Sequence, residues 1–138
     1  MSLFLDTGVV VAAHNVRDAN HARALEIMRE VRTGEHGTTY SSDFVLDEAV
    51  TLALVRTRSR EIALDIGRFL LPERPAQGMV ALLHADEATV RRAWASFVNR
   101  ETSLSFTDWT IVELVRALRI DRVASFDAAL DAWVSRLA

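Results

Sequence analysis

Four acidic residues, spread along the whole chain, stand where the pattern of the sequence would bring their carboxylates together. Asp6 and Asp127 each follow a strand-like apolar run. Asp108 begins a helical segment, and Glu48 lies on the apolar line of another. Burying an unpaired carboxylate is costly, and four together would repel one another unless a positive charge lay between them. A divalent metal ion is the simplest such charge.

The chemistry that such a group supports is metal-assisted hydrolysis. Hard oxygen ligands select Mg²⁺ or Mn²⁺ over softer metals, and a metal site of this kind suits the hydrolysis of a phosphodiester bond. The chain has no cysteine, which excludes zinc–thiolate sites and thiol nucleophiles. The histidines show no metal-ligand spacing, although His14 lies about two turns beyond Asp6, at the edge of the expected site: His14, His21, His36 and His84.

Three of the acids also have a purely structural explanation. Asp6 and Asp127 can cap the helical segments that they precede, with Thr7 as a hydroxyl neighbour of the first or as the cap itself. The spacing Ser105-x-x-Asp108 fits a capping box, in which the acid serves the start of the helix. Each acid is therefore a weak signal alone, and the argument for a site depends on their shared position.

Glu48 is the most informative of the four, because its side chain belongs to the apolar face of its helix. Its neighbours on that face are Val45, Ala49 and Leu52. An acid on a buried face needs an arginine or a metal as its partner. Asp47 belongs to the polar line of the same helix and is interpreted as surface, as is Asp131 one turn after the last acid.

Short apolar or β-favouring runs alternate with amphipathic segments from end to end. We expect strands at residues 3–5, 38–41, 79–83 and 122–126, and helices at residues 7–13, 20–32, 42–58, 61–71, 86–99, 105–118 and 127–137. This alternation predicts an α/β fold of a single domain over residues 1–138, a three-layer α/β/α sandwich around a four- or five-stranded parallel sheet. Ligands of such sheets bind at the carboxyl ends of the strands, where Asp6 and Asp127 are expected.

The composition limits which kinds of partner the protein can bind. The net charge of −3 excludes a basic coat for nucleic acid, so any such contact must be local. All basic residues are arginine. Arg56, Arg58 and Arg60 lie close together at one predicted helix end, where their charges either interact favourably with the helix dipole or attract the phosphates of a nucleic acid. No apolar run approaches the roughly 20 residues of a membrane span, and we expect a cytoplasmic protein without membrane contact. The tryptophans are expected in core or interface: Trp94, Trp109 and Trp133.

In this order and context the four acids resemble those of the PIN-domain family, most closely its small VapC-type toxin nucleases. The matching stretches cover nearly the whole chain: LFLDTGVVVAA, TTYSSDFVLDEAVTLALVR, LSFTDWTIVELVRALRI and RVASFDAALD. The last stretch is similar to the family pattern T-x-D-x-x-F. It departs from that pattern at Leu130, where the family usually has an aromatic residue.

This resemblance implies an endoribonuclease that depends on Mg²⁺ or Mn²⁺ and cleaves RNA. It implies that the catalytic residues are also the metal ligands, namely Asp6, Glu48, Asp108 and Asp127. It further implies a homodimer and the toxin of a type II toxin–antitoxin pair, inhibited by a small antitoxin protein. Two alternatives within the family are a catalytically inactive PIN-like binding module and a PIN nuclease of RNA processing without a toxin role.

Other classes with an acidic pocket fit the sequence less well. The triplet Asp6-Thr7-Gly8 also opens aspartic proteases, but those are all-β proteins. Phosphate-accepting receiver domains carry an active-site lysine, and this chain has no lysine. A haloacid-dehalogenase-type phosphatase requires a second aspartate two positions after the first, where this chain has Gly8.

Overall fold

The computed structural model describes residues 1–138, which surround a five-stranded parallel sheet. The strands are β1 (Ser2–Leu5), β2 (Thr38–Ser42), β3 (Ala81–Leu83), β4 (Arg122–Ala124) and β5 (Arg136–Leu137). They lie in the order β3-β2-β1-β4-β5, so β1 is the central strand. Its apolar residues are fully buried, as a strand covered on both faces requires.

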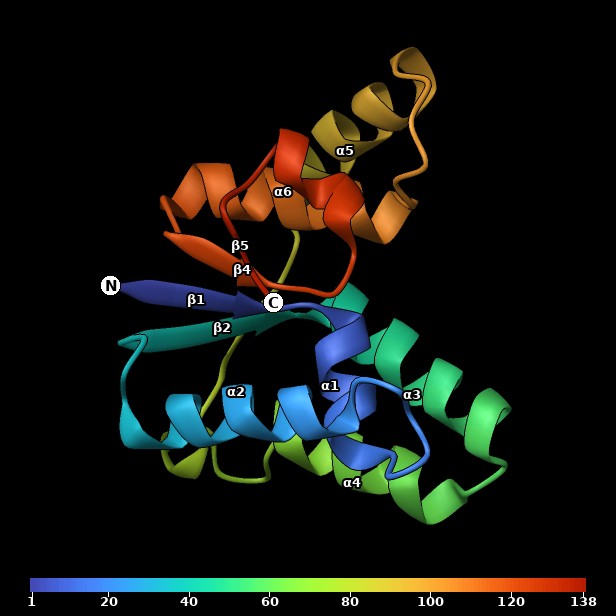
Figure 1. Ribbon diagram of the computed structural model, residues 1–138. Coiled ribbons are helices and arrows are strands. Elements are labelled where there is room, and N and C mark those ends of the chain that lie inside the picture. Colours follow the sequence, from blue (N-terminus) through green and yellow to red (C-terminus); the bar gives the residue numbers. More distant parts are fainter.

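Six helices cover the two faces of this sheet. They are α1 (Thr7–His14), α2 (His21–Thr33), α3 (Asp43–Thr57), α4 (Arg60–Leu70), α5 (Glu87–Asn99) and α6 (Phe106–Leu118). Figure 1 shows α5 and α6 above the sheet and α1, α2 and α4 below it. The predicted three-layer α/β/α sandwich is therefore confirmed. None of these helices combines the length and apolarity that crossing a membrane requires.

The order of the strands creates a switch point at the centre of the sheet. From β1 the chain passes to β2 and β3 on one side, and it then crosses to β4 on the other side of β1. The pairing of Leu5 with Ala124 aligns the carboxyl ends of β1 and β4. The N–H group of Asp6 donates to the carbonyl of Ala124 at 3.1 Å. In open α/β sheets the ligand crevice lies at such a point.

Helix α1 begins directly after β1 and shows how burial overrides local preference. Its Val9, Val10 and Val11 are β-branched, which disfavours a helix. All three are fully buried, and Asp6 caps the first turn. Packing against α2, α3 and α4 therefore stabilises a helix that the isolated segment would not form.

The predicted closing helix over residues 127–137 is wrong. The chain instead forms a short 3₁₀ turn, η2 (Ala128–Ala132), and then the edge strand β5. The N–H of Val123 donates to the carbonyl of Ser135 at 2.8 Å, and the N–H of Ser125 donates to the carbonyl of Leu137 at 3.0 Å. The segment forms a strand despite its local preference for a helix, because its residues complete the backbone hydrogen bonding of β4.

Smaller differences concern element ends. Strand β4 stops at Ala124 rather than at residue 126, because the next residues turn into η2. Strand β3 begins at Ala81 rather than at residue 79, after a loop that contains the 3₁₀ turn η1 (Pro75–Gln77).

Candidate functional site

Asp6 lies at the carboxyl end of β1 and is the most buried of the four predicted acids, with 6% of its surface exposed. Its Oδ1 accepts a hydrogen bond from the N–H of Thr7 at 2.7 Å. Its Oδ2 accepts one from the hydroxyl of Ser125 at 2.6 Å. The predicted capping role is therefore present, and both carboxylate oxygens are held in fixed positions at the start of α1.

Ser125 joins two of the acids and was not among the predicted site residues. Besides donating to Asp6, its hydroxyl accepts the N–H of Asp127 at 3.1 Å. The Asp127 carboxylate is exposed, and its Oδ1 accepts the N–H of Ala129 at 3.0 Å at the start of η2. The signal that could have found it is the pattern T-x-D-x-x-F, in which Ser125 occupies the position of the threonine.

Asp108 forms the capping box that the Ser105-x-x-Asp108 spacing predicts. The N–H of Ser105 donates to Oδ2 of Asp108 at 2.8 Å, and the N–H of Asp108 donates to Oγ of Ser105 at 3.1 Å. This bond occupies only one oxygen of the half-buried carboxylate. No hydrogen bond within the protein engages Oδ1, so a structural role and ligand binding are compatible in this residue.

Glu48 projects from the middle of α3 and is half-buried. Asp47, next to it, is exposed, as predicted. Helix α3 contacts α6, and Phe44 on α3 packs edge-on against Phe106 on α6, with ring centroids 5.7 Å apart. Phe44 precedes Glu48 by one turn, and Phe106 lies two residues before Asp108. This contact therefore holds the two helices together beside both acids.

The four acids form one electrostatic cluster. The pKa of Asp6 is raised from 3.8 to about 6, chiefly by burial; the negative charges of Asp108 and Glu48 add to the rise, and the hydrogen bonds from Ser125 and Thr7 oppose it. The pKa of Asp108 is also raised, first by burial and then by the charges of Asp127 and Glu48. Each acid is therefore close enough to at least one other to affect its ionisation.

No positive side chain forms an ion pair with this cluster. The ion pairs of the protein leave out all four acids. Arg136, whose pKa the charge of Asp127 helps to raise, directs its guanidinium to Asp131 at 2.7 Å. Beside Asp6, the buried Oγ1 of Thr7 has no hydrogen-bond partner. Carboxylates without an ion-pair partner and an unpartnered hydroxyl are the oxygen donors that a hard cation selects.

The four acids do not form a complete set of metal ligands by themselves. No group of three or more acidic or histidine side chains lies close enough together to form a complete metal cage. Mg²⁺ keeps several of its waters and takes one or two carboxylates. In charge and donor type the residues therefore fit a partly hydrated Mg²⁺ or Mn²⁺ ion, which Asp6 and Asp108 would hold with Glu48 and Asp127 beside them.

Other predicted residues lie outside the cluster. The ring of His14 hydrogen-bonds through Nδ1 to the carbonyl of Val10 at 2.8 Å, at the far end of α1. Asp131 is exposed surface paired with Arg136. Trp109 is buried and packs edge-on against the half-buried Trp133, with centroids 4.8 Å apart, as expected for a core residue. Trp94, by contrast, is 57% exposed on α5.

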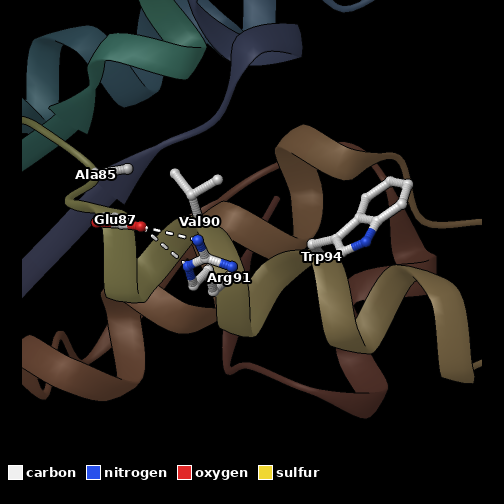
Figure 2. A pocket seen from close by; sticks show the side chains of 5 residues that line it. All are labelled: Ala85, Glu87, Val90, Arg91 and Trp94. Atoms are coloured by element: carbon white, nitrogen blue, oxygen red, sulfur yellow. Dashed lines mark hydrogen bonds and ion pairs between the residues drawn. The ribbon is translucent and has the colours of Figure 1, made fainter.

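A separate pocket of about 510 Å³ lies at the start of α5 (Figure 2). Its lining contains none of the four acids: Ala85, Glu87, Val90, Arg91 and Trp94. Figure 2 shows the Arg91 guanidinium turned toward Glu87, which accepts two hydrogen bonds from it at 3.0 and 2.9 Å. The one positive charge of this pocket is therefore neutralised within the helix.

Comparison with known proteins identifies the family. The model of the PIN domain matches residues 3–133, so the chain belongs to the PIN-domain family. A search of curated proteins finds no match to the sequence.

Solved structures share the fold. The toxin VapC20 of Mycobacterium tuberculosis superimposes with a TM-score of 0.80 at 24% identity, covering 94% of this chain and 93% of VapC20. VapBC2 of Rickettsia felis gives a TM-score of 0.66 at 13% identity, with 99% and 98% coverage of this chain and of that one. FitAcB of Neisseria gonorrhoeae gives 0.64 at 16% identity, with 99% and 96% coverage.

Proposed function

We propose that this chain is an endoribonuclease that depends on Mg²⁺ or Mn²⁺ and is the toxin of a type II toxin–antitoxin pair. The observation that carries the proposal is a carboxylate cluster without ion-pair partners at the switch point of the sheet. We propose that its members are both catalytic and metal-ligating: Asp6, Glu48, Asp108 and Asp127. Residues 1–138 would act as one nuclease domain within a homodimer.

The residues of the site have distinct tasks in this proposal. Ser125 and the N–H of Thr7 fix the orientation of Asp6, and a pre-oriented carboxylate binds a cation with little further loss of freedom. Asp108 contributes the oxygen that its capping bond leaves free. When bound, the metal supplies charge stabilisation for the phosphoryl group and acidifies water. Glu48 would orient water molecules, and the exposed Asp127 would complete the outer side of the site.

The solved relatives support the toxin role. VapC20 is described as a toxin that cleaves the sarcin–ricin loop, and VapBC2 is described as bound to DNA from its promoter. A shared fold together with the acids in the family's order supports RNA as substrate and a small antitoxin as partner. The identity of the RNA that this chain cleaves requires a direct assay.

The decisive experiment separates a nuclease from an inactive binding module. We expect the purified protein to cleave single-stranded RNA in millimolar Mg²⁺ or Mn²⁺ and to lose this activity in EDTA. Asp6→Asn should lower the rate by about two orders of magnitude without unfolding the protein, whereas Asp47→Asn, an exposed control, should not. Cleavage by Asp6→Asn at the wild-type rate would refute the proposed site.

The toxin role has its own test. Induced expression of the wild-type chain in a bacterial host should arrest growth, and Asp6→Asn should not. Coexpression of a small protein encoded next to the gene should restore growth and form a complex with the chain. Equal growth arrest by Asp6→Asn would show that the acid cluster is not the cause of toxicity.

A further inference from the structure

A basic pocket of about 420 Å³ lies at the far ends of α1 and α3 from the acid cluster, and we call it the arginine pocket. Its lining contains no carboxylate: His14, Asn15, Val16, Arg17, Arg56, Thr57 and Ile62. The first four residues come from the end of α1 and the segment after it, and Arg56 and Thr57 form the end of α3. A hollow with two guanidinium groups and no acid favours an anion.

The two arginines of this pocket have no partner in the protein. Neither the Arg17 nor the Arg56 guanidinium takes part in any ion pair, and the one hydrogen bond of Arg17 is donated by its backbone N–H to Asn15. Arg91, in the pocket of Figure 2, is by contrast bound twice to Glu87. The charge of the arginine pocket is therefore available to a ligand.

Neither guanidinium of this pocket is hydrogen-bonded to the helix end beside it. Arg56 lies in the last turn of α3, where its charge suits the helix dipole. The carbonyl of Leu54 accepts the N–H of Arg58 at 2.9 Å, and the carbonyl of Ala12 at the end of α1 accepts the N–H of Asn15. A charge–dipole interaction of this kind leaves the N–H groups of the guanidinium free for a ligand.

Asn15 adds a further donor. The Nδ1 proton of His14 is already donated to the carbonyl of Val10, so His14 lines the pocket without a free donor. The backbone N–H of Arg17 occupies Oδ1 of Asn15, so its amide NH₂ has no bond within the protein. This combination of two arginines and an amide matches the oxygens of a phosphate group.

The position of the arginine pocket relates it to the acid cluster. Helices α1 and α3 pack together, and each runs from an acid to the pocket. At 1.5 Å per residue, the distance along the axis is about 10 Å from Thr7 to His14 and about 12 Å from Glu48 to Arg56. A stacked strand of nucleic acid carries one phosphate per 3.4 Å or so, so this separation corresponds to about three nucleotides.

We propose that the arginine pocket binds a backbone phosphate of the RNA substrate about three nucleotides from the bond that is cleaved. This inference rests on the proposed ribonuclease function and adds a substrate contact to it. The cluster of carboxylates repels RNA, and the net charge of the chain is −3. A local group of arginines beyond the acids offsets this repulsion and sets the direction in which the strand crosses the site.

The test is RNA binding by a variant that lacks both arginines. In an Asp6→Asn background, which prevents cleavage, Arg17→Gln/Arg56→Gln should bind a fluorescent twelve-nucleotide single strand about tenfold more weakly than its parent. The slope of log Kd against log salt should fall by about 0.7, the value for one phosphate of a single strand. Unchanged affinity and slope would overturn the arginine pocket as a subsite.

A control of equal charge is Arg29→Gln/Arg32→Gln. Both residues are exposed on α2 and take part in no ion pair, and α2 ends at the opposite edge of the sheet, before β2 begins. This variant should keep the parental affinity and slope. An equal loss of affinity in both variants would show that only the net charge of the protein matters, and it would overturn the proposal.

Two further measurements separate the possible outcomes. In the otherwise wild-type enzyme, Arg17→Gln/Arg56→Gln should raise KM for a twelve-nucleotide RNA and leave that for a trinucleotide unchanged, because the short chain does not reach the pocket. Perturbation of the Arg17 and Arg56 NMR signals by inorganic phosphate but not by RNA would define a free-anion site and overturn the proposal. Normal cleavage of both RNAs by the variant would refute only the subsite, whereas a wild-type chain that cleaves no RNA would refute the ribonuclease itself.

Discussion

The hydroxyl of Ser125 donates a 2.6 Å hydrogen bond to Oδ2 of Asp6, across the boundary between β4 and β1. The same oxygen atom of Ser125 accepts the N–H of Asp127 at 3.1 Å. One small side chain therefore orients the most buried acid of the cluster and fixes the backbone of the most exposed one. Groups that orient metal ligands in this way are as important to a metal site as many of the ligands.

Removing this hydroxyl tests whether it has that role. We expect Ser125→Ala to raise the pKa of Asp6 further, because the lost hydrogen bond favours the charged form. RNA cleavage at limiting Mg²⁺ should fall by about tenfold to a hundredfold, and part of this loss should be recovered at high Mg²⁺. Single-turnover cleavage over a range of Mg²⁺ concentrations measures both effects. Ser135→Ala, at an exposed position, should behave as wild type; equal rates in all three proteins would exclude a role for Ser125.

The pKa of Asp6 predicts how the stability of the metal-free protein depends on pH. Its value in the folded protein, about 6, lies above the ordinary 3.8. Between these values the folded chain holds a proton that the unfolded chain has released, so the free energy of unfolding falls as the pH rises from about 4 to about 6. The difference between the two pKa values corresponds to about 3 kcal/mol, and the raised pKa of Asp108 acts in the same direction.

Urea unfolding in EDTA between pH 4 and pH 7.5 measures this dependence. Asp6→Asn keeps a neutral side chain at all pH values, so we expect it to match wild type near pH 4 and to exceed it by about 2–3 kcal/mol at pH 7. Asp47→Asn, whose side chain is exposed, should follow the wild-type curve. Parallel curves for wild type and Asp6→Asn would contradict the assigned burial penalty.

Much of this site can be predicted locally, because each acid stands next to a recognisable element. The apolar run of β1 leads directly into Asp6, and parallel strands bring their carboxyl ends to one edge. The capping box of Ser105 and Asp108 is visible in its spacing alone. The hydrogen bond from Ser125 to Asp6 cannot be found in this way, because it joins residues 119 positions apart and depends on the register of β1 and β4.

The errors of prediction have the same cause. The alanine-rich segment after Asp127 favours a helix locally, but Arg136 and Leu137 pair with the free edge of β4 and form a fifth strand. The sequence groups Arg56 with Arg58 and Arg60 at the end of α3, as the structure has them, but only the fold shows that Arg17 from another helix end lines a pocket with Arg56. Non-local packing decides both cases.

Metal binding should stabilise the folded protein, because it relieves the repulsion among the acids. We expect Mg²⁺ at a hundred times its Kd to raise the free energy of unfolding by about 2.7 kcal/mol, measured as a rise in melting temperature over the millimolar range. The rise should be lost in Asp6→Asn and Asp108→Asn and retained in Asp47→Asn. A wild-type melting temperature that does not change when Mg²⁺ or Mn²⁺ is added would count against a preformed site.

Leu130 stands where the family pattern has an aromatic residue, and its side chain is fully buried beneath η2. Its N–H donates to the carbonyl of Asp127 at 3.2 Å. We expect Leu130→Ala to lower the free energy of unfolding by about 2–4 kcal/mol through a cavity, and Leu130→Met to cost less than about 1.5 kcal/mol. Denaturant unfolding measures both, with Leu118→Ala on the exposed side of α6 as the control. If Leu130 acts only in packing, the Leu130→Met variant should cleave RNA at the wild-type rate; a large loss of cleavage with intact stability would instead give this position a role in placing Asp127.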